Sequence, residues 1–180
     1  MNRFLIVPIL MILFFSCSEE KIEPQVGQQQ DSAKIPDQES WNSKVIMTED
    51  GILRAILFSD HITVYEDQNI KLLDNVKIDF YNEQQQKTTT LTSNKGKVDD
   101  KTNNLYAIQN VVAISDSGDT LWTDELMWNN KRKKITTDKF VTIASKKERI
   151  EGYGFESDQH LRNYVIFNIT FITQTKEVNK

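Results

Sequence analysis

The sequence LTSNKGKVDDKTNNLYAIQNVVAIS at Leu91–Ser115 is followed by LWTDELMWNNKRKKITTDKFVTIAS at Leu121–Ser145. The second stretch repeats the spacing of apolar and polar positions in the first with an offset of 30 residues. A period of roughly 20–50 residues indicates a supersecondary unit that buries its apolar face only by stacking on its neighbours. Each unit reads as strand, polar turn and strand, with the first turn expected near Asn94–Gly96. The repeat therefore predicts stacked antiparallel hairpins.

The same pattern extends to both sides of the repeat. Short runs rich in Val, Ile, Thr, Tyr and Phe, which favour sheet, continue from Trp41 to Ile172. Residues 150–172 form a fainter third copy, and no segment after the N-terminal apolar run has a helical period. The sequence therefore predicts an all-β, antiparallel fold, in which two sheets of hairpins face each other about 10 Å apart as a sandwich.

Alternation along the strands selects the side chains expected to point inward. Val76, Ile78 and Phe80 share one strand face, while charged residues between them take the other. The full set expected on the inner face is Val76, Ile78, Phe80, Ile108, Val112, Ile114, Val141, Ile143, Val165, Phe167, Ile169 and Phe171. These side chains form the core of a closed sandwich or, if the two sheets splay, an apolar trough for acyl chains. The sequence leaves both forms open.

The N-terminus reads as a secretory signal followed by a tether. An almost unbroken apolar run of about a dozen residues begins at Phe4, which is too short for a membrane-spanning helix of about 20 residues. The run ends at Ser16-Cys17, which resembles a bacterial lipobox, although Phe14 stands where Leu is preferred. We expect removal of residues 1–16, lipidation of Cys17, a polar tether over residues 17–40 and a folded domain over residues 41–180.

The charge pattern argues against a nucleic-acid partner. The chain has 22 basic and 26 acidic residues, for a net charge of −4, and Lys131–Lys134 is its only basic run of four. We interpret this run as a solvated turn between strands, with electrostatic docking to an anionic headgroup as the alternative.

Catalytic and metal-binding patterns are missing from the sequence. It has two histidines and one cysteine, and no phosphate-binding loop or nucleophile elbow occurs. The adjacent carboxylates at Asp99–Asp100 and Asp124–Glu125 would face opposite sides of a strand and so do not form an acid–base pair. Asp116–Asp119 lacks the remaining ligands of a calcium loop and reads as a hairpin turn. We therefore expect no enzymatic activity, no metal site and no cofactor.

Spaced Leu, Thr, Asp, Val and Gly positions in Asp119–Asn129, Ile135–Ile143 and Ile150–Asp158 resemble the LptC family. The resemblance covers roughly Trp41–Ile172 and implies a β-jellyroll, a repeat unit that related bridge components share. It implies a periplasmic component that receives lipopolysaccharide from an inner-membrane ABC transporter and passes it to an LptA-like bridge protein. It also implies an apolar interior for acyl chains and edge strands that join neighbouring jellyrolls.

The expected anchor departs from that of many family members, which carry a transmembrane helix. Here the lipidated Cys17 would tether the protein to the inner membrane from the periplasmic side. A periplasmic or surface-exposed lipoprotein that acts as a non-catalytic scaffold or adhesin, with a closed core, is the alternative reading.

Overall fold

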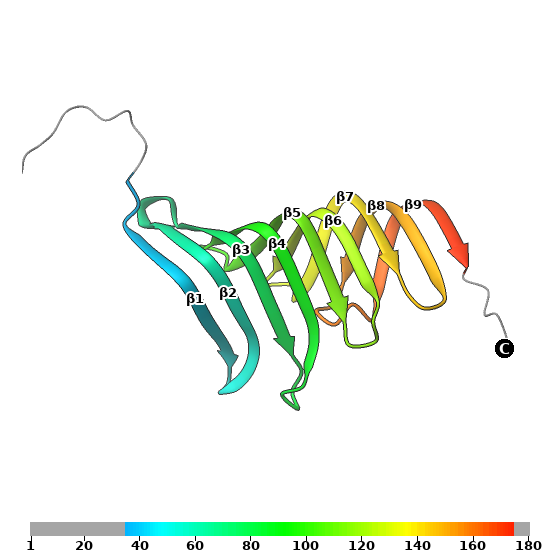
Figure 1. The fold of residues 1–180 in the computed structure, drawn as a ribbon, viewed down its shortest axis with the longest axis horizontal. Coiled ribbons are helices and arrows are strands. Elements are labelled where there is room, and N and C mark those ends of the chain that lie inside the picture. The colour runs from blue at the N-terminus through cyan, green and yellow to red at the C-terminus, as the bar shows by residue number, and fades with distance from the viewer. Residues whose placement is uncertain (1–34, 175–180) are drawn as a thin grey trace, which may run out of the picture. The chain divides into compact units, whose positions relative to one another are not determined.

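The computed structural model describes residues 35–174, and this part of the chain is built almost entirely from strands. The strands are β1 (Gln38–Glu49), β2 (Ile52–Tyr65), β3 (Ile70–Tyr81), β4 (Lys87–Asp99), β5 (Asn104–Ser115), β6 (Thr120–Asn129), β7 (Lys134–Ala144), β8 (Glu148–Ser157) and β9 (Tyr164–Gln174). A 3₁₀ turn, η2 (Glu66–Gln68), joins β2 to β3. The strands form one antiparallel sheet in the order β1 to β9 (Figure 1). The predicted all-β fold of stacked antiparallel hairpins is confirmed.

The boundaries of the described part bear on the predicted N-terminal organisation. β1 begins at Gln38, so the last residues assigned to the tether belong to the sheet. The expected signal segment, Cys17 and most of the expected tether lie outside the described residues. Within residues 35–174 the structure contains no helix long and apolar enough to cross a membrane.

The two copies of the sequence repeat form equivalent hairpins in the structure, as predicted. The first copy forms the hairpin of β4 and β5, and the second forms that of β6 and β7. Leu91 and Leu121 occupy equivalent buried positions, as do Val111 and Val141, and none of the four is more than 3% exposed. The turn expected near Asn94–Gly96 is wrong, because β4 runs through this segment with an irregularity in its register.

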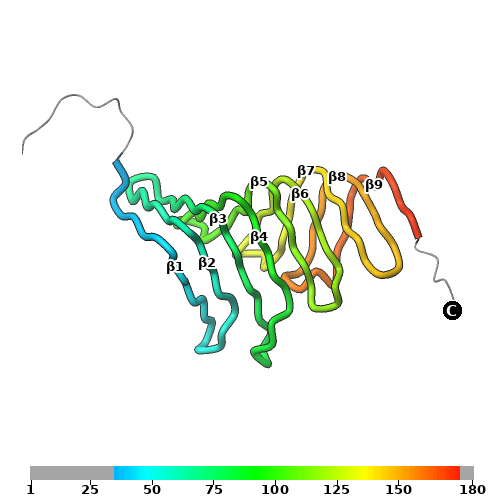
Figure 2. Tube along the Cα trace, in the orientation of Figure 1, coloured from blue at the N-terminus to red at the C-terminus, as the bar shows by residue number. Residues whose placement is uncertain are grey.

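Most strands bend near their middle, where the register shifts or a residue takes a left-handed backbone. Asn42, Asn75, Asn110 and Gly154 have φ values of 51°, 49°, 52° and 76° at these bends. Asn and Gly adopt this conformation at the lowest steric cost, and an inserted residue bends a strand and increases its twist. The two facing layers expected from the sequence are therefore two halves of one continuous sheet, which folds over on itself (Figures 1 and 2).

The bends also shift which side chains point inward along a strand. In β3 the buried positions step from Leu73 to Val76, three residues rather than two, and in β6 they step from Thr123 to Leu126. Both layers therefore contribute to one hydrophobic core. The fully buried members with the largest side chains are Phe155, Leu57, Ile78, Leu121, Leu126, Ile135, Ile143 and Leu161.

The inward assignment for β5 is wrong. Ile108 and Val112 are only partly buried, and Ile114 is 46% exposed. The buried apolar residues of β5 are instead Ala107, Val111 and Ala113, which are fully shielded from solvent. The inner face uses small side chains here because β5 lies opposite large inward residues of its neighbours, with Ala113 paired between Leu91 and Leu121.

The inward assignment for β9 is wrong for three of its four members. Ile166 is the buried residue of this strand and pairs with Phe155, and the next inward position is Ile169, opposite Gly152. Phe167 alternates with these residues and is 63% exposed on the outer face. Val165 and Phe171 also point outward. Ile169 faces inward as expected but is 50% exposed, because β9 ends the sheet.

An apolar trough between the two layers

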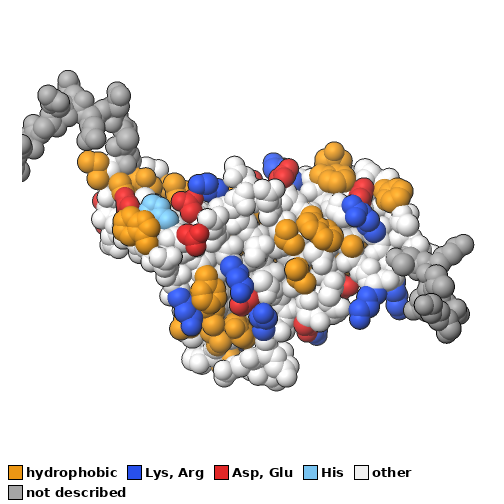
Figure 3. Space-filling model, viewed as in Figure 1, with side chains coloured by type: hydrophobic (Ala, Val, Ile, Leu, Met, Phe, Trp, Pro, Cys, Tyr) orange, Lys and Arg blue, Asp and Glu red, His pale blue; other side chains and the backbone are white. Residues whose placement is uncertain are grey.

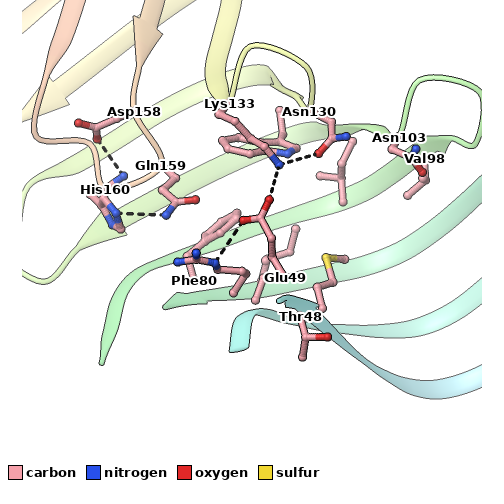
Figure 4. A pocket seen from close by; sticks show the side chains of 16 residues that line it. Thr48, Glu49, Phe80, Val98, Asn103, Asn130, Lys133, Asp158, Gln159 and His160 are labelled. Carbon is pink, nitrogen blue, oxygen red and sulfur yellow. Dashed lines mark hydrogen bonds and ion pairs between the residues drawn. The ribbon is translucent and has the colours of Figure 1, made fainter. Parts of the chain in front are cut away.

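A cavity of about 910 Å³ lies between the layers near the N-terminal end of the sheet. Its apolar wall comes from both layers. Ala55, Ile78 and Phe80 line one side, and Val98, Leu105 and Trp128 line the other. Met47, Thr48, Glu49, Arg54, Asn103, Asn130, Lys133, Asp158, Gln159 and His160 complete the lining (Figure 4). We call this cavity the trough.

The loop between β8 and β9 closes one part of the open rim, and it joins the two layers. Thr89 Oγ1 donates a hydrogen bond of 3.1 Å to the Gln159 carbonyl oxygen, and His160 Nδ1 lies 2.8 Å from Thr88 Oγ1. Leu161 inserts its side chain into the core and is 1% exposed. These contacts join residues about 70 positions apart in the sequence, so the loop acts as a strap across the rim.

Asp158 organises the strap. Burial would raise the pKa of this carboxyl group, but hydrogen bonds from the Asn163 side chain and from the backbone N–H groups of Arg162 and His160 outweigh it. The pKa of Asp158 therefore lies below its ordinary value of 3.8. Arg162 also pairs with Asp116 of the β5–β6 turn at 2.7 Å, which adds a further link across the rim.

Three charged side chains meet at the mouth of the trough, beyond the apolar wall. Glu49 ends β1, Arg54 lies in β2, and Lys133 comes from the turn between β6 and β7. Glu49 Oε2 is 3.3 Å from Arg54 Nε, and Glu49 Oε1 is 3.3 Å from Lys133 Nζ. Figure 4 shows the Glu49 carboxylate directed toward Lys133 at this mouth. The first three residues of the basic run form the turn expected between the strands, Lys134 begins β7, and Lys133 pairs across the rim.

The two ends of the sheet are open for pairing. β1 pairs with β2 alone and β9 pairs with β8 alone among the described strands. β1 exposes Trp41, Val45 and Ile46, and β9 exposes apolar residues on both faces. Long edge strands with apolar side chains are templates for pairing with another chain.

The outer face carries scattered apolar side chains among charged ones (Figure 3). Trp122 is 40% exposed there, next to Phe140, whose ring meets Tyr153 edge-on at 5.1 Å. Trp128 on the same strand points inward, so the three-residue step in β6 places the two tryptophans on opposite faces.

Two of the sequence-predicted inward residues, Ile78 and Phe80, line the trough. Val76, Val141 and Ile143 face inward as expected but lie in the closed core. The residues selected from sequence do not include Ala55, Val98 or Leu105, and the shared parity of Trp122, Leu126 and Trp128 left open whether these three form core or part of an apolar groove. Trp128 carried a usable signal, because its position 30 residues after Val98 marks it as a repeat partner of an inward residue.

Other sequence candidates have local structural roles. Asp99 Oδ1 accepts hydrogen bonds from the backbone N–H groups of Lys101 and Thr102 in the β4–β5 turn, and Asp100 pairs with Lys71. Within the described residues, no group of three or more His, Cys, Asp or Glu side chains is arranged to hold a metal ion.

A bent antiparallel sheet with an apolar space between its layers is the architecture of a β-jellyroll. The family model described as "Lipopolysaccharide-assembly, LptC-related" matches residues 4–168, and the chain belongs to this family. No curated protein matches the chain. The family is one of periplasmic, envelope-associated components of lipopolysaccharide transport, so the protein takes part in that transport.

Proposed function

We propose that this protein receives lipopolysaccharide from an inner-membrane ABC transporter and passes it along a periplasmic jellyroll bridge. The observation that supports this proposal is the trough, whose apolar wall is formed by both layers of the sheet. In this proposal an acyl chain enters the trough from its open side while the sugars stay in water.

The energetics of burial favour acyl chains as the occupants. Each methylene group transferred from water to an apolar wall contributes about 0.8 kcal/mol. The wall offers Ile78, Phe80 and Trp128, and its volume of about 910 Å³ is in the range of ligand cavities that hold large apolar groups. Polar groups at the mouth are placed to meet the hydrophilic part of an amphiphile.

The open edges support a place within a chain of similar domains. A partner jellyroll adds to β1 or to β9 through backbone hydrogen bonds, as in β-augmentation. In our proposal β9, which follows the trough-closing strap, hands the cargo to an LptA-like bridge protein, and β1 faces the membrane subunits of the transporter.

The anchor in this proposal is Cys17, acylated after removal of residues 1–16. Two or three acyl chains give stable attachment, whereas one gives only marginal binding. The residues between Cys17 and the start of β1, 18–37, reach roughly 65–70 Å at most if fully extended at about 3.3–3.6 Å per residue. This reach lets the jellyroll stand clear of the inner membrane on its periplasmic side.

Photo-crosslinking in reconstituted vesicles tests the handover. Vesicles carry the ABC transporter and lipopolysaccharide, and the protein carries a photoreactive amino acid in place of Phe80 in the trough or Ile114 on the outer face. We expect an ATP-dependent lipopolysaccharide adduct at position 80 and none at position 114. Equal adducts at both positions, or none at position 80 with ATP, would contradict the proposal and favour a non-catalytic scaffold.

A further inference from the structure

The charged residues at the mouth of the trough form an arrangement that the acyl-chain account does not explain. Glu49 lies between two cations, Arg54 and Lys133, and each carboxylate oxygen meets a different one. The side chains of Glu49 and Lys133 are 50% and 56% exposed, so both can exchange partners with a ligand from solvent. Partly exposed ion pairs of this kind contribute little to stability and are readily replaced.

The pair of Glu49 and Lys133 also spans the rim. The two residues lie 84 positions apart, one in the β1–β2 hairpin and one in the β6–β7 hairpin. Their contact therefore holds two rims of the trough together near its mouth. A group that separates Glu49 from Lys133 would release this link.

Arg54 has donor capacity that Glu49 does not use. Its Nε atom is buried and makes no hydrogen bond, although it lies within ion-pair distance of Glu49. A guanidinium group has five N–H donors in a fixed plane, which matches the oxygens of a phosphate. Lys133 adds a second cation, whose present partners are Glu49 and the side-chain oxygen of Asn130 at 3.4 Å.

The opposite wall adds little competing negative charge at this point. The Asp158 carboxylate accepts hydrogen bonds from Asn163 and from the backbone of its own loop. Gln159 and His160 contact each other at 3.1 Å, and His160 contacts Thr88. Glu49 is thus the anion that sits on Arg54 and Lys133.

We propose that Arg54 and Lys133 form a phosphate-binding subsite at the mouth of the trough, and that Glu49 is its internal counter-ion. A phosphate on an acyl-chain amphiphile displaces the Glu49 carboxylate and bridges Arg54 and Lys133 in its place, while the acyl chains enter beside Ala55 and Phe80. This inference rests on the proposed function, because it assigns the headgroup contacts of the same cargo.

The test measures binding of the full-length protein in detergent to lipopolysaccharide, to the same lipid after phosphatase treatment, and to inorganic phosphate. We expect Arg54→Gln and Lys133→Gln each to weaken binding of the phosphorylated lipid about tenfold and to leave the dephosphorylated lipid unchanged. Glu49→Gln should instead tighten binding of the phosphorylated lipid, because the competing anion is gone. A purely structural role for these residues predicts weaker binding in all three variants.

Arg132→Gln is the matched control. Arg132 belongs to the same basic turn and is 57% exposed, but it pairs with Glu156 and does not line the trough. Arg132→Gln should leave the binding of the phosphorylated and the dephosphorylated lipid unchanged. If Arg132→Gln weakens binding of the phosphorylated lipid as much as Arg54→Gln and Lys133→Gln do, net charge explains the effect and the assignment is overturned.

The remaining outcomes separate this inference from the proposed function. If wild-type protein binds neither lipid, the phosphate subsite and the proposed function are both overturned. If wild-type protein binds both lipids and the Arg54 and Lys133 variants keep the same preference, the phosphate subsite alone is overturned. If inorganic phosphate competes as strongly as the phosphorylated lipid, the site recognises a free anion, and the assignment to a lipid headgroup is overturned.

Discussion

Replacement of Val111 by Ala tests which face of β5 is buried. Val111 is fully shielded from solvent, with Thr123 as its cross-strand partner, whereas Ile114 on the same strand is 46% exposed. Val111→Ala removes two methyl groups, a loss of about 1.6 kcal/mol at about 0.8 kcal/mol each. The cavity that remains in a core built from both layers adds about 1 kcal/mol. We expect Val111→Ala to lower the free energy of unfolding by about 2.5 kcal/mol.

Ile114→Ala provides the matched comparison within the same strand. It removes more carbon than Val111→Ala, but roughly half of that surface is already in water and no enclosed cavity remains. The expected loss in the free energy of unfolding is about 1 kcal/mol or less. The smaller deletion should therefore be the more damaging one.

Urea denaturation of a chain that begins at Ser18 measures both values. The urea midpoint should fall more for Val111→Ala than for Ile114→Ala, with unchanged slope in each case. The opposite order would show that Ile114 belongs to the core and would refute the assignment of the β5 faces.

Three further outcomes follow from particular contacts. Gly152→Val places side-chain atoms against the Asn168 carbonyl oxygen and within 2.7 Å of Ile166 Cγ2. It should cost about 1–3 kcal/mol and abolish hydrogen-exchange protection in β9 before other strands, whereas uniform loss of protection would argue against a local effect. The pKa of Asp158 is depressed below 3.8, so its stabilisation is present above that pH and is lost as pH falls through the folded pKa. Urea midpoints measured between about pH 5 and about pH 2 should fall more for wild type than for Asp158→Asn, and parallel curves would exclude this role. Cys17→Ala should move the protein from the membrane fraction to the soluble fraction, and continued tight association would exclude the lipid anchor.

The repeat predicted the hairpin order because strand, turn and strand recur with a fixed spacing. The same spacing also contained information that alternation alone missed. An offset of 30 maps the buried Val141 and Ile143 onto Val111 and Ala113, not onto Val112 and Ile114. Ile108, Val112 and Ile114 were selected by alternation, which does not decide between the two faces of a strand with apolar residues on both. In β5 the inner face is the one with the smaller side chains, at Ala107, Val111 and Ala113.

Strict alternation failed at the bends for a physical reason. An irregular residue such as Asn75 or Gly154 shifts the inward face by one position, so residues on the two halves of a strand follow different parity. Polar residues within apolar strands are the sequence signal of these bends. Asn94 was such a signal, and it marks an irregularity inside β4 rather than a turn.

The trough was only partly predictable from sequence. Ile78 and Phe80 follow from local alternation, but Val98, Leu105 and Trp128 reach the same cavity only because the sheet folds over. The contact between Glu49 and Lys133 depends on two hairpins far apart in the chain. No local pattern encodes such a contact.

Tryptophan fluorescence tests most directly whether acyl chains occupy the trough. The chain has three tryptophans, of which Trp128 lines the trough and Trp41 and Trp122 are exposed elsewhere. Variants with phenylalanine at two of these positions isolate either Trp128 or Trp122 as the emitter. Lipopolysaccharide should shift Trp128 emission to shorter wavelength and shield it from acrylamide, while Trp122 stays unchanged. Protection of Trp122 with no change at Trp128 would contradict the central claim.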